Sequence, residues 1–362
     1  MGIYSIKIQN FKSIRETDDI LIKPLNVLIG PNGAGKSNFI SFFKFLNRLF
    51  EQQLQLYIAL HGRAENFLYF GRKGSDFLSG KIVFDNEYKN EYEFKMVPDQ
   101  QGNLIFAEEW SNISYPGNSN YDKKIINSFG TLESALKDND AYRNKYLVDQ
   151  FSSFKIFHFH DTSFNAKVKQ PATTTDYAYL YEDAGNLAAF LYRLQERFPT
   201  HFKMIERVIQ SIAPFFDRFY LQPDEINPQQ IYLRWLEKGS DQLFNAHNLS
   251  DGTLRMICLT TLLMQPELPS TIIIDEPELG LHPFAISKLA ALIQSAATRT
   301  QVIISTQSIN LLDQFEADDV IVVERENNQT VFKRQNKESL ADWLEDYSLG
   351  ELWDKNVLGG RP

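Results

Sequence analysis

Residues 30–37 constrain the fold of this chain more than any other segment. They read GPNGAGKS and fill every position of the pattern G-x-x-x-x-G-K-[ST]. The apolar segment LNVLIG precedes them, as a short strand would, and FISFFKFLNRLF follows with the spacing of an amphipathic helix. Strand, glycine-rich loop and helix in this order form a P-loop, so the sequence predicts an α/β fold built around one.

The residues of this loop suit the chemistry of phosphate binding. Gly33 and Gly35 lack the β-carbons that would keep a phosphate away from the backbone amides. Lys36 would place a positive charge on the β- and γ-phosphates, and the Ser37 hydroxyl would complete a magnesium site. We therefore expect ATP and Mg²⁺ as cofactors. The expected nucleotide-binding residues of the loop are Asn32, Gly33, Ala34, Gly35, Lys36, Ser37 and Asn38.

A second strand should bring carboxylates to the P-loop. The segment TIIIDEPELGLHP contains an apolar run, and Asp275 and Glu276 follow it at the carboxyl end, where open parallel sheets bind their ligands. We expect Asp275 to share the magnesium ion with Ser37. Glu276 is the expected general base for an attacking water. The alternative interpretation is an ordinary solvated turn, because adjacent acids often close a strand.

The rest of the chain divides by its hydrophobic periodicity. Residues 1–115 alternate in period two outside the P-loop helix, which predicts an N-terminal lobe of antiparallel strands with the P-loop. Residues 116–215 contain segments with helical spacing, such as GTLESALKDND and NLAAFLYRLQERF, and predict a helical insertion. In residues 216–338 strands and helices alternate, which predicts a C-terminal lobe with a parallel sheet. Residues 339–362 form a tail.

Composition argues against several classes of protein. The chain of 362 residues has a formal net charge of −9, unlike the basic surface of a non-specific nucleic-acid binder. It contains no apolar run of about 18 residues and no secretory signal, so we expect neither a membrane span nor export. The single cysteine, Cys258, leaves no internal disulfide. These features together predict a cytoplasmic protein.

The segment NLSDGT has the character of a helix start. Ser250, Asp251, Gly252 and Thr253 come directly before an apolar stretch, and a helix N-terminus of this kind can hold an anion. No anion-binding partner lies near it in sequence. Taken alone, the segment therefore favours an ordinary capped helix.

Two histidine patterns invite a metal interpretation. FHFHD places His158 and His160 on one face of a strand, a usable metal pair, with Asp161 beside them. Nothing nearby completes such a site, so the pattern favours a strand edge. His282 stands before Pro283 at an expected helix start, which favours a capping residue over a metal ligand.

Five segments, taken in order, resemble the ABC-type head shared by RecF, SMC-like and OLD-type ATPases: NFKS, GPNGAGKSN, LSDGT, DEPELGLHP and IISTQS. The ending LGELWDKNVLGGRP resembles the stand-alone predicted ATPases of the AAA-21 or AAA-15 grouping. The resemblance implies a P-loop NTPase head with an antiparallel β lobe, a parallel-sheet lobe and a helical insertion. It also implies ATP hydrolysis with Lys36, Glu276 and Gln307 as catalytic residues. Because Gln307 stands where relatives carry the switch histidine, and donates a hydrogen bond without carrying charge, we expect slow hydrolysis.

The same resemblance implies a homodimer that closes around ATP. In such heads the signature segment of one subunit caps the γ-phosphate on the P-loop of the other, and the segment matching residues 278–283 runs along the dimer interface. Ser250 and Gly252 would then contact, in trans, the ATP held by Lys36 of a second copy. Asp251 stands where many relatives carry glycine, so its charge must point away from the nucleotide.

The resemblance to RecF and OLD-type heads implies work on DNA, in repair or in defence against phage. No nuclease or toprim-like motif follows residue 338, so we expect any effector to be a separate polypeptide; whether the chain itself contacts DNA stays open. An alternative from another class is a nucleotide-gated scaffold, whose ATP state exposes a docking surface such as the tail around Trp343 and Trp353. A transporter ATPase is disfavoured, because DEPELGLHP departs from the transporter pattern and Gln307 replaces the switch histidine.

Overall fold

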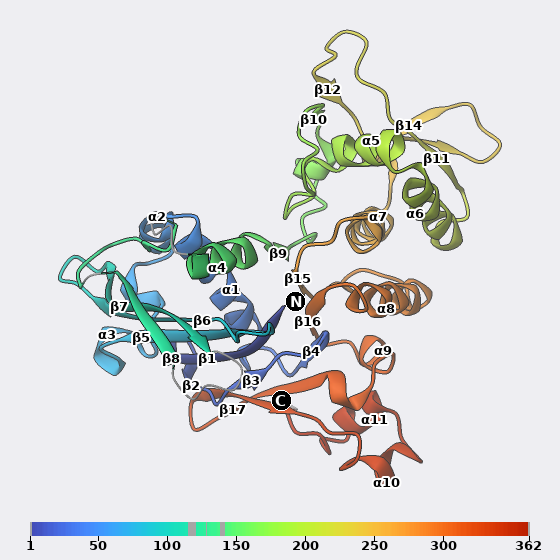
Figure 1. The fold of residues 1–362 in the computed structure, drawn as a ribbon. Helices are drawn as coiled ribbons and strands as arrows, with labels where there is room; N and C mark the ends of the chain where they lie inside the picture. Colours follow the sequence, from blue (N-terminus) through green and yellow to red (C-terminus); the bar gives the residue numbers. More distant parts are fainter. Residues whose placement is uncertain (1, 115–120, 128, 138–141, 361–362) are drawn as a thin grey trace.

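Two large sheets form the frame of the molecule, and they lie on either side of the P-loop helix (Figure 1). The structure, a computed structural model, describes residues 2–114, 121–127, 129–137 and 142–360. The first sheet is antiparallel, with the order β2-β1-β5-β6-β7-β8 and with β3 paired to β1, as the period-two alternation predicts. Its strands are β1 (Ile3–Phe11), β2 (Ile14–Glu16), β3 (Ile20–Leu21), β5 (Leu78–Phe84), β6 (Glu91–Pro98), β7 (Leu104–Ser114) and β8 (Tyr121–Asn127).

The second sheet is mainly parallel and contains the P-loop strand. Its order is β18-β17-β4-β16-β15-β9, and only β18 runs antiparallel, to β17. Its strands are β4 (Leu25–Ile29), β9 (Phe154–Phe157), β15 (Thr271–Asp275), β16 (Gln301–Thr306), β17 (Val320–Glu326) and β18 (Gln329–Arg334). β4 and β15 lie on either side of β16 and run the same way, so their carboxyl ends point to one edge of the sheet. That edge is where parallel sheets bind ligands.

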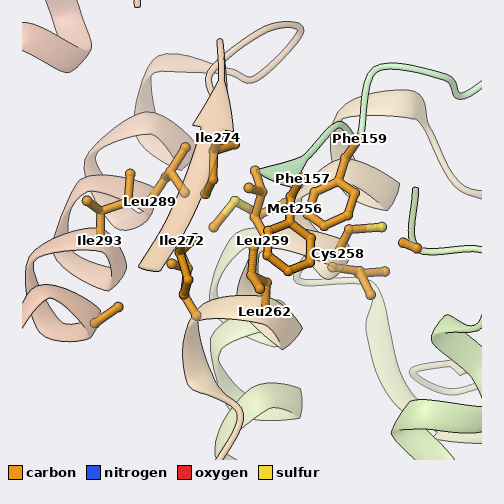
Figure 2. Packing of buried hydrophobic residues seen from close by; sticks show 14 of the residues in the cluster. Phe157, Phe159, Met256, Cys258, Leu259, Leu262, Ile272, Ile274, Leu289 and Ile293 are labelled. Carbon is orange, nitrogen blue, oxygen red and sulfur yellow. The ribbon is translucent and has the colours of Figure 1, made fainter. Parts of the chain in front are cut away.

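Alternate residues of the parallel strands belong to two different cores. Ile273 and Ile303 pack in the core shared with the antiparallel sheet and with α1 (Lys36–Phe50). Ile272 and Ile274 pack in the core shared with α7 (Asp251–Met264) and α8 (Pro283–Ala297). Figure 2 shows the second core, where side chains of α7, including the buried free thiol Cys258, gather near β15. This period-two burial places a layer on each face of the sheet.

The phenylalanines of α1 fill the space between the two sheets. Phe39, Phe42 and Phe45 are fully buried, and the ring of Phe42 meets that of Phe11 edge-to-face with 5.3 Å between centroids. Burying such a side chain contributes on the order of 2–3 kcal/mol. The helix that follows the P-loop is therefore anchored over its whole length.

A third group of short elements lies apart from the two sheets, at the upper right of Figure 1, and α7 leads from it back to the parallel sheet. It contains a two-stranded sheet, β10-β12, and a three-stranded sheet, β11-β13-β14. Its elements are β10 (Ala172–Thr173), α5 (Leu187–Arg197), α6 (Pro199–Ile212), β11 (Phe216–Tyr220), β12 (Gln230–Ile231), β13 (Arg234–Glu237) and β14 (Leu243–Asn245). The remaining helices are α2 (Leu54–Leu60), α3 (Gly71–Gly74), α4 (Tyr142–Ser152), α9 (Ile309–Leu312), α10 (Ala341–Leu344) and α11 (Leu349–Asp354).

The element boundaries differ from the sequence expectation in three places. The antiparallel sheet continues past residue 115, because β8 pairs with β7. Residues 116–215 are not only helical, since β9 from this stretch forms the outer edge of the parallel sheet. The segment GTLESALKDND forms turns, not a helix, over residues 130–137, and its residues 138–140 lie outside the described part of the chain.

The P-loop strand also lies elsewhere than expected. We expected β4 within an N-terminal lobe of antiparallel strands, but it pairs with β16 and β17, which come from the far end of the chain. Its burial explains this, because a strand covered on both faces is mainly apolar, and four of its five residues are. The exception, Asn26, is buried and donates from Nδ2 to the carbonyls of Lys23 and Val302.

Candidate functional site

The P-loop connects β4 to α1 and is braced by a distant threonine. Gly35 has φ 118°, and a β-carbon on it would lie 2.1 Å from Oγ1 of Thr330 in β18. Thr330 Oγ1 donates to the carbonyl of Ala34 over 2.8 Å and lies 2.7 Å from Ser13 Oγ. Asn38 Nδ2 donates to the same Ser13 Oγ over 2.7 Å. The loop is thus held by a hydrogen-bonded pair of residues, Thr330 and Ser13. Of the two, only Ser13 belongs to a motif, NFKS.

Lys36 is turned toward its own loop. Its Nζ donates to the carbonyls of Gly30 over 2.5 Å and Pro31 over 3.1 Å, and the side chain is 5% exposed. Burial lowers the pKa of Lys36, and the nearby carboxylates of Glu276, Asp275 and Glu278 oppose that shift. The P-loop lysine and the acids after β15 therefore share one electrostatic environment, as the sequence predicted.

Ser37 and Asp275 line one cavity of about 600 Å³. Ser37 is exposed at the start of α1, and Asp275 Oδ1 accepts a hydrogen bond from Ser305 Oγ, its registered neighbour in β16. A hydroxyl and a carboxylate are oxygen ligands of the kind that Mg²⁺ prefers. The residues present therefore fit a magnesium ion bound with phosphate oxygens and water.

Glu276 and Gln307 are in direct contact. Gln307 Nε2 donates to Glu276 Oε1 over 2.5 Å, and the Glu276 amide donates to the carbonyl of Ser305 over 2.9 Å. Glu276 has φ 43°, a left-handed conformation that costs an L-residue free energy and recurs at functional sites. The candidate base thus has one carboxylate oxygen held by the switch glutamine.

A second glutamate, Glu278, lies beside this pair. Its Oε1 accepts from Thr306 Oγ1 over 2.5 Å and weakly from the amide of Gln307 over 3.4 Å, while its buried Oε2 has no protein partner. Burial raises the pKa of Glu278. No individual role for Glu278 was predicted from the sequence, although it lies in the segment DEPE with Asp275 and Glu276.

His158 also lines the cavity of Ser37 and Asp275. The sequence favoured a position at a strand edge and did not predict this one. It follows β9 directly, and because Phe157 pairs with Ile274, His158 comes next to Asp275 in the sheet. Its Nε2 is buried without a hydrogen-bond partner. Burial, with a smaller effect from Lys44, lowers its pKa to about 4, so the ring is neutral at neutral pH.

Neither histidine pattern forms a metal site. His160 Nε2 lies 2.9 Å from the backbone carbonyl of Asp275, and His282 caps α8 by accepting from the amide of Phe284. Within the described ranges, no three His, Cys, Asp or Glu side chains are grouped so as to hold a metal ion. The capping interpretation of His282 is confirmed.

The helices formed by the described residues are all too short or too polar to span a bilayer.

The signature segment begins α7. Ser250 is the N-cap, its Oγ accepting from the amide of Thr253 over 3.2 Å, and it is exposed. Asp251 Oδ1 lies 3.6 Å from Lys169 Nζ, so its charge has a partner on its own chain. Gly252 packs tightly, because a β-carbon there would lie 2.7 Å from the carbonyl of Gly280. Among the described residues, no hydrogen bond or ion pair joins this segment to the P-loop of the same chain.

Arg255 ties the signature helix to two other segments of the site. Its Nε donates to the carbonyl of Phe159 over 3.1 Å and its Nη2 to that of His160 over 2.8 Å, while Nη1 donates to the carbonyl of Leu279. These carbonyls belong to FHFHD and to ELGLHP. The arginine therefore fixes three motif segments relative to one another, which its place in TLRM did not indicate.

A second cavity, of about 540 Å³, opens beside Asn38 in the first turn of α1. Lys12 and Arg325 supply positive charge, and Phe70 presents an aromatic ring that is 60% exposed. The full lining is Lys12, Ser13, Asn38, His61, Asn66, Phe67, Tyr69, Phe70 and Arg325, with no acidic side chain. An aromatic and cationic cavity next to a P-loop suits a nucleoside.

Comparison with known proteins was made for the whole chain. The family model described as AAA domain, putative AbiEii toxin, Type IV TA system matches residues 25–313. The chain is 22% identical to Old nuclease of Escherichia phage P2 over 377 residues, which cover 93% of this chain and 62% of that protein. It is 24% identical to DNA double-strand break repair Rad50 ATPase of Methanopyrus kandleri over 162 residues, which cover 42% of this chain and 16% of that protein. It thus spans less than two thirds of either relative.

A solved structure gives the fold. The crystal structure of the SmcHead bound to the C-winged helix domain of ScpA aligns with a TM-score of 0.63, covering 94% of this chain and 100% of that chain. The sequences are 14% identical, so the likeness concerns the fold alone. The expected fold class, an α/β P-loop head with an antiparallel and a parallel sheet, is confirmed.

Proposed function

The chain belongs to the family described as AAA domain, putative AbiEii toxin, Type IV TA system, among the RecF-, SMC- and OLD-like ABC-type ATPases, and from this premise we propose that it binds ATP with Mg²⁺ and hydrolyses it slowly. The observation that carries the proposal is the meeting of Lys36, Asp275 and Glu276 at one edge of the parallel sheet. Lys36 would hold the β- and γ-phosphates and leave the loop carbonyls it now contacts.

Each remaining group has a role set by its position. Ser37 and Asp275 would hold the ion, whose charge supports phosphate departure. Glu276 would accept a proton from the attacking water, and Gln307 would orient that carboxylate. A neutral amide in place of an imidazole adds no positive charge near the γ-phosphate, which is the reason for slow turnover. The nucleoside would lie in the cavity beside Asn38.

ATP binding can be measured directly. We expect calorimetry with ATP and Mg²⁺ to give a dissociation constant for the wild-type chain, and Lys36→Ala to weaken binding at least about tenfold, since a charged hydrogen bond is worth about 1.5–3 kcal/mol. Adenosine without phosphates should bind both proteins equally. Equal ATP affinity of the two proteins would refute the assignment of the site.

We further propose that two copies close around two ATP molecules. Ser250 is exposed at a helix N-terminus, and an ion pair with Lys169 draws the neighbouring Asp251 carboxylate toward its own chain. The Ser250 hydroxyl, which here contacts Thr253, and the amides of the first helical turn would then be available to an anion. Because no polar contact joins the signature to the P-loop among the described residues of one chain, the anion would be a phosphate held by a second copy.

The biological role is proposed from the relatives. The names of two relatives, Old nuclease and DNA double-strand break repair Rad50 ATPase, refer to a nuclease and to DNA repair. We therefore propose a role in DNA repair or in defence against phage, with a nuclease or toprim-like effector. Stimulation of ATP turnover by DNA would support this role. No stimulation by linear, nicked or single-stranded DNA would count against it.

A second candidate, a nucleotide-gated scaffold, rests on one surface feature. Trp343 of α10 is 47% exposed, and its ring lies tilted against that of Tyr347, with 6.2 Å between centroids. Such a residue suits an interface anchor. A complex with another protein that forms or breaks with the nucleotide state, and is lost in Trp343→Ala, would favour the scaffold over DNA-dependent turnover.

A further inference from the structure

The C-terminal segment Leu349–Gly360 reaches back to the elements that flank the site, and we call it the tail clamp. Its amide at Gly350 donates to Asp313 Oδ1, directly after α9, over 2.6 Å. Its amide at Gly360 donates to Glu324 Oε2 of β17 over 3.1 Å. α9 begins two residues after the switch glutamine, and β17 pairs with the P-loop strand, Val322 opposite Ile29. The tail clamp therefore contacts elements on both sides of the P-loop strand β4: β17 on one side, and α9, which follows β16, on the other.

The contact with α9 leaves no free space. A β-carbon on Gly350 would lie 2.3 Å from Ile309 Cγ2 and 2.7 Å from Asp313 Oδ1, closer than real atoms approach. Leu349 and Leu352 of α11 are buried in the same core as Leu311 and Leu312 of α9. α9 thus lies between α8 on one side and α11 on the other.

The connection from α9 to Gln307 is short and rigid. The amide of Ser308 donates to Thr306 Oγ1 over 2.9 Å, and Ser308 Oγ caps α9 by accepting from the amide of Leu311 over 3.3 Å. Gln307 stands between these two anchored residues. Because α9 has only four residues, packing rather than its own hydrogen bonds sets its position. A displacement of α9 is therefore passed to the Gln307 side chain.

We propose that the tail clamp positions Gln307 against Glu276 and so sets the rate of ATP hydrolysis, without contacting the nucleotide. This inference rests on the proposed ATPase function. Gln307 meets Glu276 through a single hydrogen bond, so a shift of α9 by a fraction of an ångström weakens the orientation of the base. Gly350 contacts Ile309 and Asp313, whereas the P-loop is held by Thr330 and Ser13, so a change at Gly350 leaves ATP affinity unchanged.

The test variant is Gly350→Ala, whose added methyl must displace Ile309 or Asp313. We expect kcat to fall about tenfold, an effect of the size that misplacement outside the reacting groups produces, with ATP affinity within about twofold of wild type. Val357→Ala is the matched control, because Val357 belongs to the tail clamp and is exposed; it should leave both quantities unchanged. A wild-type kcat in Gly350→Ala, or a parallel loss of ATP affinity, would overturn the proposal.

A double-mutant cycle separates positioning from general destabilisation. In Gln307→Ala the residue to be positioned is absent, so adding Gly350→Ala should lower single-turnover hydrolysis no further. Additive losses would show that the tail clamp acts on another group and would overturn the proposal. If Gly350→Ala does not fold, Asp313→Ala removes the same link without added volume, and the same non-additivity is expected.

The experiment also distinguishes the two levels of inference. If the wild-type chain hydrolysed ATP no faster than Lys36→Ala, both the proposed ATPase function and the tail's role would be refuted. Normal hydrolysis that Gly350→Ala and Asp313→Ala both leave unchanged would refute the tail's role alone.

Discussion

Gln307 donates a hydrogen bond to Glu276, and the two residues directly follow the neighbouring parallel strands β16 and β15. The side-chain amide of Gln307 thereby orients the carboxylate of Glu276, whose backbone has a left-handed conformation. In the proposed ATPase, Gln307 would act on the base Glu276 as well as on the γ-phosphate.

Glu276→Gln should keep ATP binding and abolish most hydrolysis. Removal of a general base costs about a hundredfold or more in kcat, while Lys36, Ser37 and Asp275 remain to hold ATP and Mg²⁺. The ATP-bound dimer should also persist longer, which light scattering after gel filtration can measure. Asp342→Asn, an exposed change of the same chemistry in α10, is the control. Wild-type hydrolysis in Glu276→Gln would transfer the role of base to another carboxylate, with Glu278 the first to examine.

Ser250→Asp should abolish the ATP-dependent dimer and leave the monomer folded. Aspartate caps helices as well as serine does, so α7 keeps its start. Its negative charge, however, would face the γ-phosphate of the partner copy. Ser250→Arg should also spare monomeric ATP binding and prevent closure. Sedimentation with ATP in the Glu276→Gln background measures the dimer, and a dimer that survives Ser250→Asp would remove Ser250 from the interface.

Phe70→Ala should weaken binding of ATP but not of inorganic tripolyphosphate. Aromatic stacking on a base is worth about 1–3 kcal/mol, so we expect ATP affinity to fall about fivefold or more. The phosphates would bind elsewhere, at Lys36. Phe129→Ala, at another exposed phenylalanine, is the matched control. Equal losses for both ligands would place the nucleoside outside this cavity.

The pH dependence of stability should contain a contribution from Glu109. It is fully buried in β7, where its Oε1 accepts from the Tyr92 hydroxyl over 2.7 Å, and burial raises the pKa of Glu109. A raised folded pKa means that this contribution is present below the unfolded pKa and is lost as the pH rises through the folded pKa, at up to about 1.4 kcal/mol per pH unit.

Glu109→Gln keeps the acceptor and removes the titration. Relative to wild type, its stability should therefore improve as the pH rises from about 4.5 toward 7. Thermal unfolding of both proteins across this range gives the measurement. A difference that does not change with pH would contradict the assignment.

Local sequence patterns predicted the parts of the site that lie on contiguous motifs. GPNGAGKS specified a strand, loop and helix because glycine spacing and a phenylalanine-rich face leave few other structures. The apolar run before Asp275 specified a buried parallel strand, and Pro283 marked the start of α8. The helix predicted from the spacing of GTLESALKDND was wrong, because residues of this segment hydrogen-bond to the antiparallel sheet instead. Ser134 Oγ and the Ala135 amide both donate to Glu109 of β7.

The strand, loop and helix around the P-loop, and the grouping of Lys36 and Ser37 with Asp275 and Glu276, could be predicted from the sequence, because they follow from residue types at fixed short spacing. Which distant residues complete the site became apparent only from how the chain folds. Thr330 braces the P-loop, His158 joins the cavity of Asp275, Arg255 ties three motifs together, and Gly350 packs against α9. These contacts join residues 24 to 296 positions apart, and no local periodicity encodes them, since they depend on the order in which strands pair.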